Sequence, residues 1–499
     1  MYAYYIICIL ITIQKNARKP DPRPPRPPKK TPPPHPLLLR TRFSAQQLLG
    51  HFHKLLPASR LAAWLVLSPR IFYARAFTPL VTLWYMIFQR LSHNHHLSHV
   101  QEDAREGGAD RLSPPGKALS TRLTSESTSA YSDARQRLPL QACLQALRHT
   151  AQQFGHSFQV PQWFGLQAGL LDGSTYRLRP FGDIPKHFPP HRPGNCKKPP
   201  YWCVARVVGI LCLVTGAVLD SAVGSLRASE QVLSATLLRG RSWAGWLLLG
   251  DRNFGVYSVA RAIAAAQGHA LLRLTQVRAA KLARSAGFKL KAGLDVRLNW
   301  SPTRHDQCPE NLASAPVQGR LLGVRIHRPG FRSLTLYLFT TLIDPVRCPT
   351  QELVRLYGQR WNIEVCFRYI KAQMELGFLE CHSADIARKE WFAGLIAYNL
   401  IRWTMTSAAA VASVAPPRLS FSRARELLLG WLGRSPRHRR SALSWKRLLT
   451  RISNARQPKR RKRPPSEPRA VRQFRKDRAI LVGSRAAARK KIAQEHAKS

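Results

Sequence analysis

The chain has 499 residues, of which 44% are hydrophobic, enough for a globular core and for two or more domains rather than a disordered chain. Its 79 lysines and arginines outnumber 26 aspartates and glutamates, which gives a formal net charge of +53. Such an excess predicts a polyanionic partner, most commonly nucleic acid, although charge alone leaves a membrane surface or the ribosome open.

The first 36 residues are expected to lie outside the fold. Residues 1–14 are apolar, but no basic residue precedes the run and it is too short to cross a bilayer. Residues 15–36 are rich in proline and arginine, which favours an unstructured stretch. We therefore predict neither a secretory signal nor a membrane anchor, and expect 1–36 to be disordered or translated from upstream of the true start.

Residues 37–160 are predicted to form a helical N-terminal region. Within it, residues 78–91 are typical of a buried helix, and Pro79 suits the first turn. The following tract, His93-Asn-His-His96 with His99, is read as a loop after that helix. A transition-metal site is the less favoured alternative, because composition alone is weak evidence.

Two aspartates in residues 161–275 each follow a short apolar run. Asp172 comes after residues 168–171 and Asp251 after residues 246–250, as at the end of a buried strand at the rim of a sheet. An aspartate in that position is commonly only a turn former or a helix cap. Taken singly, each aspartate is better explained that way.

The residues around these aspartates predict the rest of a sheet. Residues 207–219 contain two β-rich runs around Thr215-Gly216, which indicates a hairpin, and Asp220 after it is taken as a structural turn residue. Residues 257–266 are expected to form a helix and residues 270–274 another strand.

The segment between Asp251 and Glu364 is too long for a simple connection within one core. Residues 323–327 and 334–341 have the pattern of strands. We therefore expect residues 276–350 to form a β-rich insertion, and residues 351–410 to return to the core as helices.

Residues 356–371 are predicted to form one helix that carries Tyr357, Arg360, Glu364 and Lys371. At 100° per residue these side chains fall within about 60° of one another, beside an apolar face. A carboxylate, two cations and a phenol suit a phosphodiester and a divalent metal; the alternative is a solvated helix flank with an Arg360–Glu364 pair. Trp361 lies off this stripe, where a packing role is favoured.

The combination of three carboxylates favours chemistry over the structural explanations. Asp172, Asp251 and Glu364 come from separate elements. Carboxylates arranged in this way can hold two hard cations that activate a water molecule and stabilise a leaving oxygen in phosphoryl transfer.

Three segments resemble the catalytic blocks of the IS4-type DDE transposases. They are Asp172-Gly-Ser-Thr, Asp251-Arg-Asn-Phe-Gly, and the set Tyr357, Arg360, Glu364 and Lys371. The resemblance runs from about residue 37 to 405, although Asn253 stands where glycine is frequent, which bears on the turn after Asp251. Further similarity lies in residues 130–139, 206–209, 328–332, 340–345, 388–391 and 397–402.

The resemblance implies an α/β fold with an RNase H-like catalytic core and DNA strand transfer as the activity. Asp172, Asp251 and Glu364 would be the catalytic residues and the ligands of two Mg²⁺ or Mn²⁺ ions. Tyr357, Arg360 and Lys371 would be DNA-binding residues at the phosphates of the cleaved end. Residues 37–160 would help to bind those ends.

The implied partners are double-stranded DNA with terminal inverted repeats, target DNA, and a second copy of the chain in a synaptic dimer, with no membrane. The implied location is the bacterial cytoplasm, at the nucleoid. Nine scattered cysteines without a C-x2-C pair predict a reducing compartment, with Cys366 as a small buried apolar residue.

Residues 411–499 are expected to form a basic tail. A run such as residues 458–463 would grip backbone phosphate, or belong to a disordered tail without a defined contact. Residues 441–452, with apolar side chains at partly helical spacing, are the segment of this tail most able to dock on the core.

Two other functions remain open from the sequence. One is a catalytically inactive, transposase-derived DNA-binding protein, and the other is an RNase H-like nuclease without specificity for ends. The complete set of three carboxylates argues against the first, and the Tyr357, Arg360 and Lys371 set argues against the second.

Overall fold

The computed structural model describes residues 38–39, 76–113, 116–190, 201–303, 306, 315–328, 331–433, 442–457 and 484–496. The expectations for residues 1–36 and for the basic run 458–463 lie outside these ranges. The chain divides into two compact units, Met1–Arg456 and Gln457–Ser499. The second unit contains one described helix, α19 (Arg485–His496).

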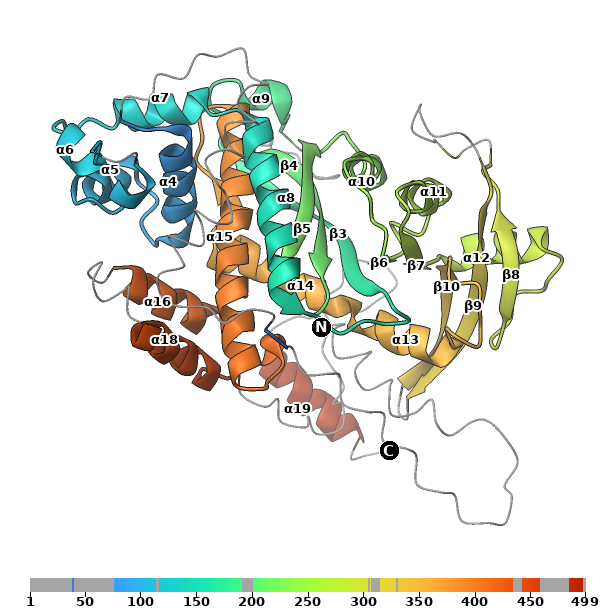
Figure 1. Ribbon diagram of the computed structural model, residues 1–499. Coiled ribbons are helices and arrows are strands. Elements are labelled where there is room, and N and C mark those ends of the chain that lie inside the picture. The colour runs from blue at the N-terminus through green and yellow to red at the C-terminus, as the bar shows by residue number, and fades with distance from the viewer. Residues whose placement is uncertain are drawn as a thin grey trace. The chain divides into compact units, whose positions relative to one another are not determined.

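The centre of the first unit is a mixed sheet of nine strands among the described residues, in the order β5-β4-β3-β6-β7-β10-β9-β8, with β11 paired to β3 (Figure 1). β6 runs parallel to both β3 and β7, β11 runs parallel to β3, and the remaining pairs are antiparallel. The strands are β3 (Gln167–Leu178), β4 (Cys203–Cys212), β5 (Val218–Ser225), β6 (Trp246–Gly250), β7 (His269–Arg273), β8 (Asp295–Trp300), β9 (Val317–Arg328), β10 (Phe331–Thr340) and β11 (Phe378–Leu379).

Helices cover both faces of this sheet, so the unit is a mixed α/β fold. On one face lie α10 (Glu230–Arg239), α11 (Tyr257–Ala265) and α12 (Gln276–Ser285). On the other lie α8 (Leu140–Ser157), α14 (Asn362–Arg368) and α15 (Ala384–Val411). Neighbouring residues of β3 divide between the two cores, as the two-residue period of a strand requires: Leu170 packs in one and Leu171 in the other.

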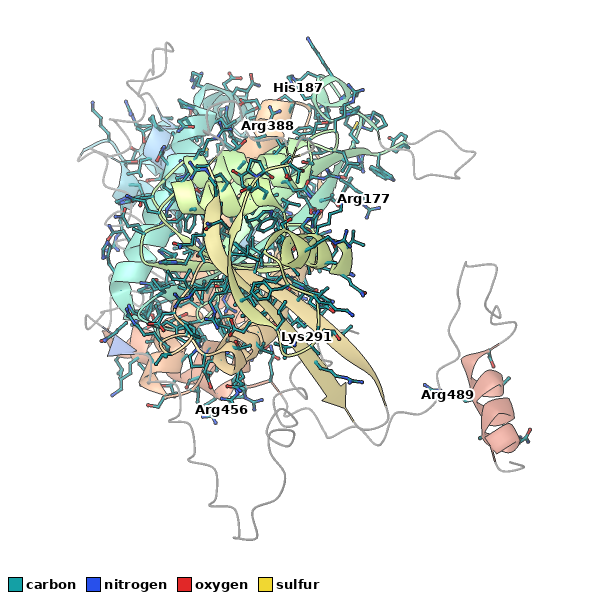
Figure 2. The ribbon with its side chains drawn as sticks, turned by 90° about the vertical axis from the view of Figure 1, so that its right-hand side faces the viewer. Arg177, His187, Lys291, Arg388, Arg456 and Arg489 are labelled. Atoms are coloured by element: carbon teal, nitrogen blue, oxygen red, sulfur yellow. The ribbon has the colours of Figure 1, made fainter. Side chains whose placement is uncertain are left out.

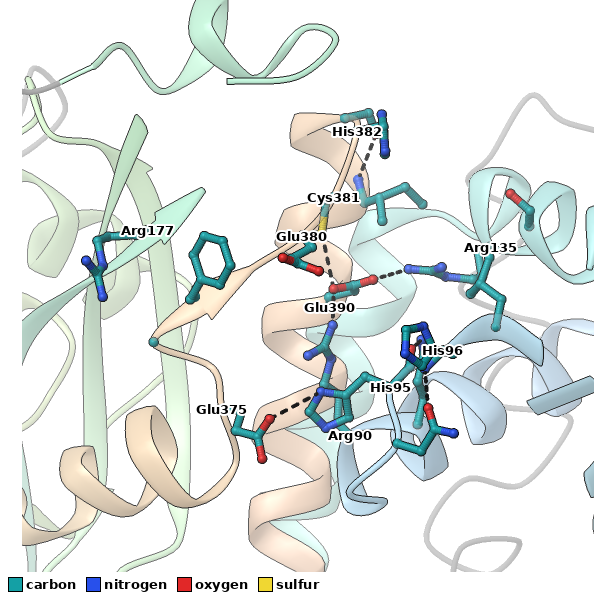
Figure 3. A pocket seen from close by; sticks show the side chains of 18 of the residues that line it. Arg90, His95, His96, Arg135, Arg177, Glu375, Glu380, Cys381, His382 and Glu390 are labelled. Carbon is teal, nitrogen blue, oxygen red and sulfur yellow. Dashed lines mark hydrogen bonds and ion pairs between the residues drawn. The ribbon is translucent and has the colours of Figure 1, made fainter. Parts of the chain in front are cut away.

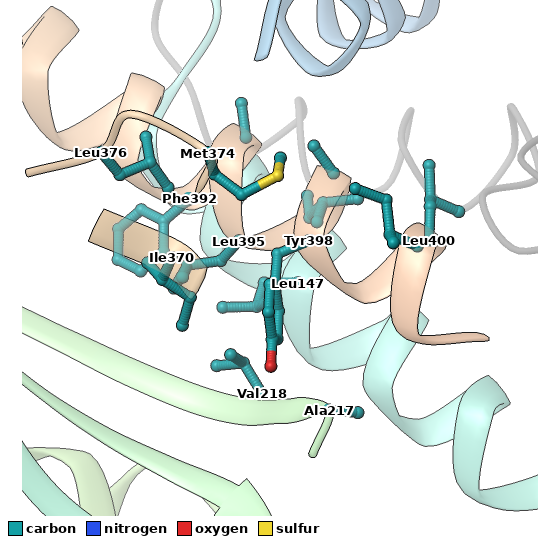
Figure 4. Close-up of a cluster of buried hydrophobic side chains, with 14 of the residues drawn as sticks. Leu147, Ala217, Val218, Ile370, Met374, Leu376, Phe392, Leu395, Tyr398 and Leu400 are labelled. Atoms are coloured by element: carbon teal, nitrogen blue, oxygen red, sulfur yellow. The ribbon is translucent and has the colours of Figure 1, made fainter. Parts of the chain in front are cut away.

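The long helix α15 organises the helical side of the unit. It packs against α8, against α4 (Pro79–Leu91), and against two C-terminal helices, α16 (Phe421–Leu432) and α18 (Ala442–Asn454). Figure 4 shows part of its apolar contact, where Leu395 and Tyr398 of α15 meet Ile370 and Leu147. Burying many such side chains of about 1.5–3 kcal/mol each makes this face a main source of stability.

The smaller elements complete the described fold. β1 (Leu38–Leu39) pairs with β2 (Phe158–Gln159) in a separate two-stranded sheet. The remaining elements are α5 (Leu97–Arg105), η3 (Asp110–Leu112), α6 (Leu119–Arg122), α7 (Ser129–Arg137), α9 (Ile184–His187), α13 (Thr350–Gly358), η4 (Gln359–Trp361), η5 (Tyr369–Gln373) and η6 (Pro416–Arg418).

The expected helix at 78–91 is confirmed as α4. The Thr78 hydroxyl caps it by accepting a hydrogen bond from the Val81 amide at 3.3 Å, and Pro79 occupies the first turn. The loop expected after it is confirmed for residues 93–96, because α4 ends at Leu91 and α5 begins at Leu97, but His99 lies within α5. Cys366 is buried as expected, and the six cysteines of the described ranges are all free.

The expected hairpin is confirmed as β4 and β5, but the expectation for Asp220 is wrong. Asp220 lies inside β5, fully buried, and receives a hydrogen bond from Arg148 Nε at 2.9 Å. Burial raises the pKa of Asp220, and the Arg148 guanidinium opposes that rise. Asp220 is therefore a structural ion-pair residue that joins β5 to α8.

The strands expected at 323–327 and 334–341 are confirmed as β9 and β10. They pair with each other, and β10 pairs with β7, so that β8, β9 and β10 prolong the central sheet. The strands of residues 276–350 thus share the sheet that carries Asp172 and Asp251.

The C-terminal boundary of the first unit lies at Arg456, later than the expected start of the tail at residue 411. α16 and α18 are part of this unit, and the Trp445 ring of α18 stacks on Trp403 of α15 at 5.9 Å between centroids. Trp445, Leu448, Leu449 and Ile452 are buried. No helix in the described ranges is long and apolar enough to cross a membrane.

Two C-terminal deletions are expected to differ. Removing residues 457–499 should leave the thermal unfolding midpoint unchanged, whereas removing 433–499 should lower it by exposing the face of α15 that α18 covers. Loss of about five phosphate contacts in the shorter deletion would reduce the slope of log affinity against log salt by roughly 4 to 5. Calorimetry and salt-dependent DNA binding measure the two effects. An unchanged slope would show that residues 457–499 do not touch DNA.

Candidate functional site

Three charged side chains stand in a row where the pairing of three parallel strands ends. In the sheet, Leu171 of β3 is the partner of Gly250 of β6, and Gly250 is the partner of Leu272 of β7. The next residues are Asp172, Asp251 and Arg273. Because adjacent strands lie about 4.8 Å apart, this register alone makes Asp172 and Asp251 neighbours.

The expectation that Asp172 ends its strand is only partly right. β3 continues to Leu178, where it pairs with β4 and with β11, and only its pairing with β6 stops at Leu171. Asp172 therefore pairs with Gly209 of β4 on one side and has no partner among the described strands on the other, and its Oδ1 accepts a hydrogen bond from the Gly173 amide at 2.8 Å.

The turn after Asp251 is closed by hydrogen bonds to the aspartate itself. Asp251 Oδ1 accepts from the Asn253 amide at 2.8 Å, and its carbonyl accepts from the Gly255 amide at 3.0 Å. Asn253 is not among the residues with positive φ, so the turn does not require the glycine that is frequent there. The Asn253 side chain also donates to Glu230 in the first turn of α10.

The single helix predicted for residues 356–371 is interrupted. α13 ends at Gly358, a 3-10 turn comes next as η4, α14 ends at Arg368, and η5 is a π-helical turn. Arg360 and Glu364 still face each other across one turn, at 3.7 Å between Nη2 and Oε1. The wider π turn changes the direction of the side chains it carries, and Lys371 faces a large cavity beside β3.

Arg360 links the helix to the sheet. Its Nη1 lies 3.2 Å from Asp172 Oδ2, so one buried guanidinium contacts both Asp172 and Glu364. The same guanidinium lies 5.2 Å from the centroid of the Trp361 ring. The acids of β3 and α14 are thus held by a shared cation.

Burial makes Asp172 and Glu364 harder to ionise than exposed acids. Burial raises the pKa of Asp172 to about 6, against the opposing effects of Arg360 and the Gly173 amide, and the nearby charges of Asp251 and Glu230 add to the rise. Burial also raises the pKa of Glu364, which Arg360 opposes. A bound cation would relieve both rises.

The structure separates Tyr357 from Lys371. Tyr357 is buried, burial raises the pKa of its phenol to about 12, and the charges of Arg360 and Arg273 oppose that rise. Its hydroxyl makes no hydrogen bond of acceptable geometry within the described ranges. Lys371 is half-buried, and burial together with Arg177 lowers the pKa of its amine.

Sequence reasoning missed two charged residues here, Glu230 and Arg273. Arg273 ends the strand predicted at 270–274, and would have been found if β7 had been placed beside β6. Glu230 gave no local signal, because its position depends on how α10 packs over β4 and β5.

The oxygen-only donor set suits a hard divalent cation, although the carboxylates do not yet converge on one point. Within the described ranges, no group of three or more His, Cys, Asp or Glu side chains is close enough to hold an ion. Arg360 contacts both Asp172 and Glu364. Asp172 and Asp251, which adjacent strands place side by side, are the carboxylates that could hold such an ion.

A stability measurement tests the charge at Asp172. Its pKa is about 6 when folded and 3.8 ordinarily, so the folded chain binds this proton more tightly and the free energy of unfolding falls as pH rises from about 4 to above 6. The Asp172→Asn variant should therefore have a higher thermal unfolding midpoint than the native chain above about pH 7, and the same midpoint near pH 4. Thermal unfolding at several pH values, with a chelator present, measures this difference. A difference that does not vary with pH would contradict the assignment.

A cavity of about 1610 Å³ opens between β3, the segment after η5, and the loop between α4 and α5 (Figure 3). Its wall contains Arg177, Lys371, Glu375 and the histidines of the tract at 93–96. At its base Glu390 is buried between Arg90 and Arg135, with Cys381 Sγ 3.1 Å from a Glu390 oxygen. Burial alone would raise the pKa of Glu390, but the two guanidiniums hold it below its ordinary value.

A family of known proteins matches the part of the chain that carries this site. Residues 163–400 match the family model described as the transposase DDE domain. The chain is 28% identical over 311 residues to transposase InsG of insertion sequence element IS4 from Escherichia coli, across 61% of this chain and 67% of that protein. Both matches confirm the resemblance to the IS4-type DDE transposases that was stated from the sequence.

One solved structure is a more distant match. The cryo-EM structure of piggyBac transposase in a synaptic complex with hairpin DNA covers 82% of each chain with 11% identity and a TM-score of 0.39. That likeness is too distant to support an argument about this chain.

Two of the segments that carried the resemblance have structural contacts. Lys389 donates to the carbonyls of Arg135 and Gln136, at 3.1 and 3.0 Å, and Trp391 donates to Ser221. Farther along α15, Asn399 hydrogen-bonds both backbone groups of Val218. These residues fasten α15 to α7 and to the β4–β5 hairpin.

Proposed function

We propose that this protein cuts and joins DNA at the ends of its own insertion sequence, with Asp172, Asp251 and Glu364 as the catalytic residues and the ligands of two Mg²⁺ or Mn²⁺ ions. The observation that carries the proposal is the register that sets Asp172 beside Asp251, with Arg360 joining Asp172 to Glu364. When bound, the ions would activate the attacking oxygen and stabilise the leaving one.

The sheet supports the RNase H-like core that the resemblance implies. Three antiparallel strands, β5, β4 and β3, continue into parallel β6 and β7, and the acids stand at the carboxyl end of that parallel part. Ligand sites of α/β sheets lie at such ends.

The chain's own cations would position the DNA. Arg360 would leave its carboxylate partners and bind phosphate oxygens instead, for which its planar guanidinium is suited. Asp172 and Glu364 would then be free to bind metal. Lys371 would contact a phosphate from the cavity side. Tyr357 is buried near Arg360 and would help to position that guanidinium, in place of the direct phosphate contact expected from the sequence.

The full proposal includes partners and place. The substrates are double-stranded DNA with terminal inverted repeats, and target DNA, held by a synaptic dimer at the nucleoid in the bacterial cytoplasm. Residues 37–160 would help to bind the ends. The excess of positive charge in the chain supports a DNA partner.

A cleavage assay tests this function. The chain is incubated with a plasmid that carries the inverted repeats found beside its gene, with Mg²⁺ or Mn²⁺, and the products are mapped to the nucleotide. Cuts at the repeat ends followed by strand transfer support the proposal. Cuts without regard to the repeats would indicate a nuclease without end specificity, and binding without cuts would indicate an inactive DNA-binding relative.

A further inference from the structure

A cluster of three aromatic rings, two of them exposed and one partly buried, lies at the end of β3 beyond Asp172. We name Tyr201, Trp202 and Phe378 the aromatic platform. The Tyr201 and Trp202 rings lie 4.9 Å apart and the Trp202 and Phe378 rings 5.0 Å apart, both edge to face. Tyr201 is 56% exposed and Trp202 is 36% exposed, which is unusual for side chains of this size.

Two arginines border these rings. The Arg177 guanidinium lies 5.9 Å from the centroid of Trp202, and the Arg179 guanidinium 5.8 Å from that of Phe378. Arg179 is paired with Glu380 at 2.6 Å. Backbone pairing between β3 and β11 fixes the arrangement, because Phe378 is the strand partner of Arg177.

Arg177 and Lys371 bring positive charge to one cavity, whose lining also includes Glu375 and Glu380. Both line the cavity, and neither makes an ion pair with any residue in the described ranges. Arg177 is close enough to lower the pKa of Lys371, an effect second to that of burial. Figure 2 shows Arg177 projecting from the sheet, and Figure 3 shows it apart from the Arg90–Glu390–Arg135 cluster. A phosphate would neutralise this pair.

The platform and the acids share one strand. Arg177 follows Asp172 by five positions on β3, about 17 Å of extended backbone. Lys371 stands on the helical run that also carries Glu364. This odd spacing directs the side chains of Asp172 and Arg177 to opposite faces of β3, so a DNA strand held at the acids would reach the platform by passing around the edge of β3 between β6 and β11.

We propose that the aromatic platform, with Arg177 and Lys371, binds unpaired nucleotides of the DNA strand that runs on from the phosphate held at Asp172 and Asp251. Exposed rings accept the faces of unpaired bases, whereas a duplex keeps those faces inside its own stack. Arginine beside the rings strengthens such stacking. The inference rests on the proposed function, since it specifies the form of the DNA that this site receives.

Binding without metal tests the platform. The full chain is titrated with fluorescent oligothymidylate and with a duplex of equal length, in chelator and at a salt concentration that screens nonspecific attraction. Trp202→Ala and Phe378→Ala should each raise Kd for oligothymidylate about fivefold or more, and change Kd for the duplex by less than about twofold. Phe288→Ala is the matched control, because Phe288 is 46% exposed and contributes to no such cluster.

Photocrosslinking gives a second readout. Oligothymidylate that contains 5-iodouracil should crosslink to Trp202 or Phe378 in peptide maps of the native chain, and Arg177→Ala should reduce the yield. An unchanged Kd for oligothymidylate in the Trp202→Ala and Phe378→Ala double variant would overturn the inference, as would equal losses on both probes or crosslinks confined to other residues. Unchanged thermal unfolding midpoints show that the variants fold.

The two proposals fail separately. A chain that binds oligothymidylate through the platform but never cuts DNA would refute the proposed function and leave the platform in place. A chain that cuts at repeat ends, and whose platform variants bind oligothymidylate normally, would refute the platform alone.

Discussion

Asp251→Asn is expected to lower the rate of DNA end cleavage by about a thousandfold while DNA affinity stays the same or rises slightly. If Asp251 holds the metal, as proposed, its loss would remove several kcal/mol of transition-state stabilisation, and about 4 kcal/mol corresponds to a thousandfold. The asparagine keeps the oxygen that accepts from the Asn253 amide, so the turn should survive. Single-turnover cleavage and equilibrium binding measure the two quantities, and Asp172→Asn should behave alike.

Glu230→Gln is the matched control for that loss. Glu230 is a carboxylate close enough to raise the pKa of Asp172, yet it accepts a hydrogen bond from Asn253 and lies beside Gly173 on the α10 side of β3. We expect its replacement to slow cleavage by less than about tenfold, about 1.4 kcal/mol. If Glu230→Gln were as damaging as Asp251→Asn, or if Asp251→Asn cut normally, the assignment of the metal ligands would be wrong.

Glu390→Ala is expected to cost about 3–5 kcal/mol of stability, the largest loss among the single changes considered. Glu390 on α15 is buried between Arg90 of α4 and Arg135 of α7, so its removal leaves two buried guanidiniums without a counter-ion. The free energy of unfolding from urea titrations measures the loss. Helices α4 and α7 should become the first segments to exchange amide hydrogens, since this ion cluster ties them to α15.

An exposed pair supplies the comparison for Glu390. Glu426 lies 2.7 Å from Arg423, with both side chains about half exposed, and Glu426→Ala should cost less than about 1 kcal/mol. A similar loss for Glu390→Ala would show that the buried cluster is not held by its charges. If the charges do hold the cluster, a double change of Arg90 and Glu390 should cost less stability than the sum of the two single changes, because the residues share one network.

Local pattern was enough to predict the strands that carry the acids. The apolar runs before Asp172 and Asp251 are short and end in polar turn residues, as buried parallel strands do, and both strands formed as β3 and β6. Register was not available from pattern, because it depends on which strands become neighbours. That is why Arg273 was missed, although β7 itself was predicted, whereas Glu230 was missed because its place depends on how α10 packs on the sheet.

The direction of Lys371 could not be predicted from a regular helical wheel. The wheel placed Lys371 in line with Glu364, but Lys371 lies in a π turn at Tyr369–Gln373, and such turns depend on tertiary packing.

The extent of the tail could not be predicted from composition. High positive charge suggested a tail from residue 411. α18 nevertheless buries an apolar face that includes Trp445 and Ile452, because a strongly amphipathic helix can dock while its charges stay in water.

The adjacency of Asp172 and Asp251 rests on backbone pairing between β3 and β6, and this sets what kinds of change in chain length the protein can tolerate. Residues added to the loops between these strands cost only a little loop entropy and leave the two acids where they are. One residue added within residues 167–171 would turn Asp172 to the opposite face of the sheet. The chain should therefore tolerate changes of length in the loops between these strands, whereas one residue added inside either strand, before its acid, should part Asp172 from Asp251.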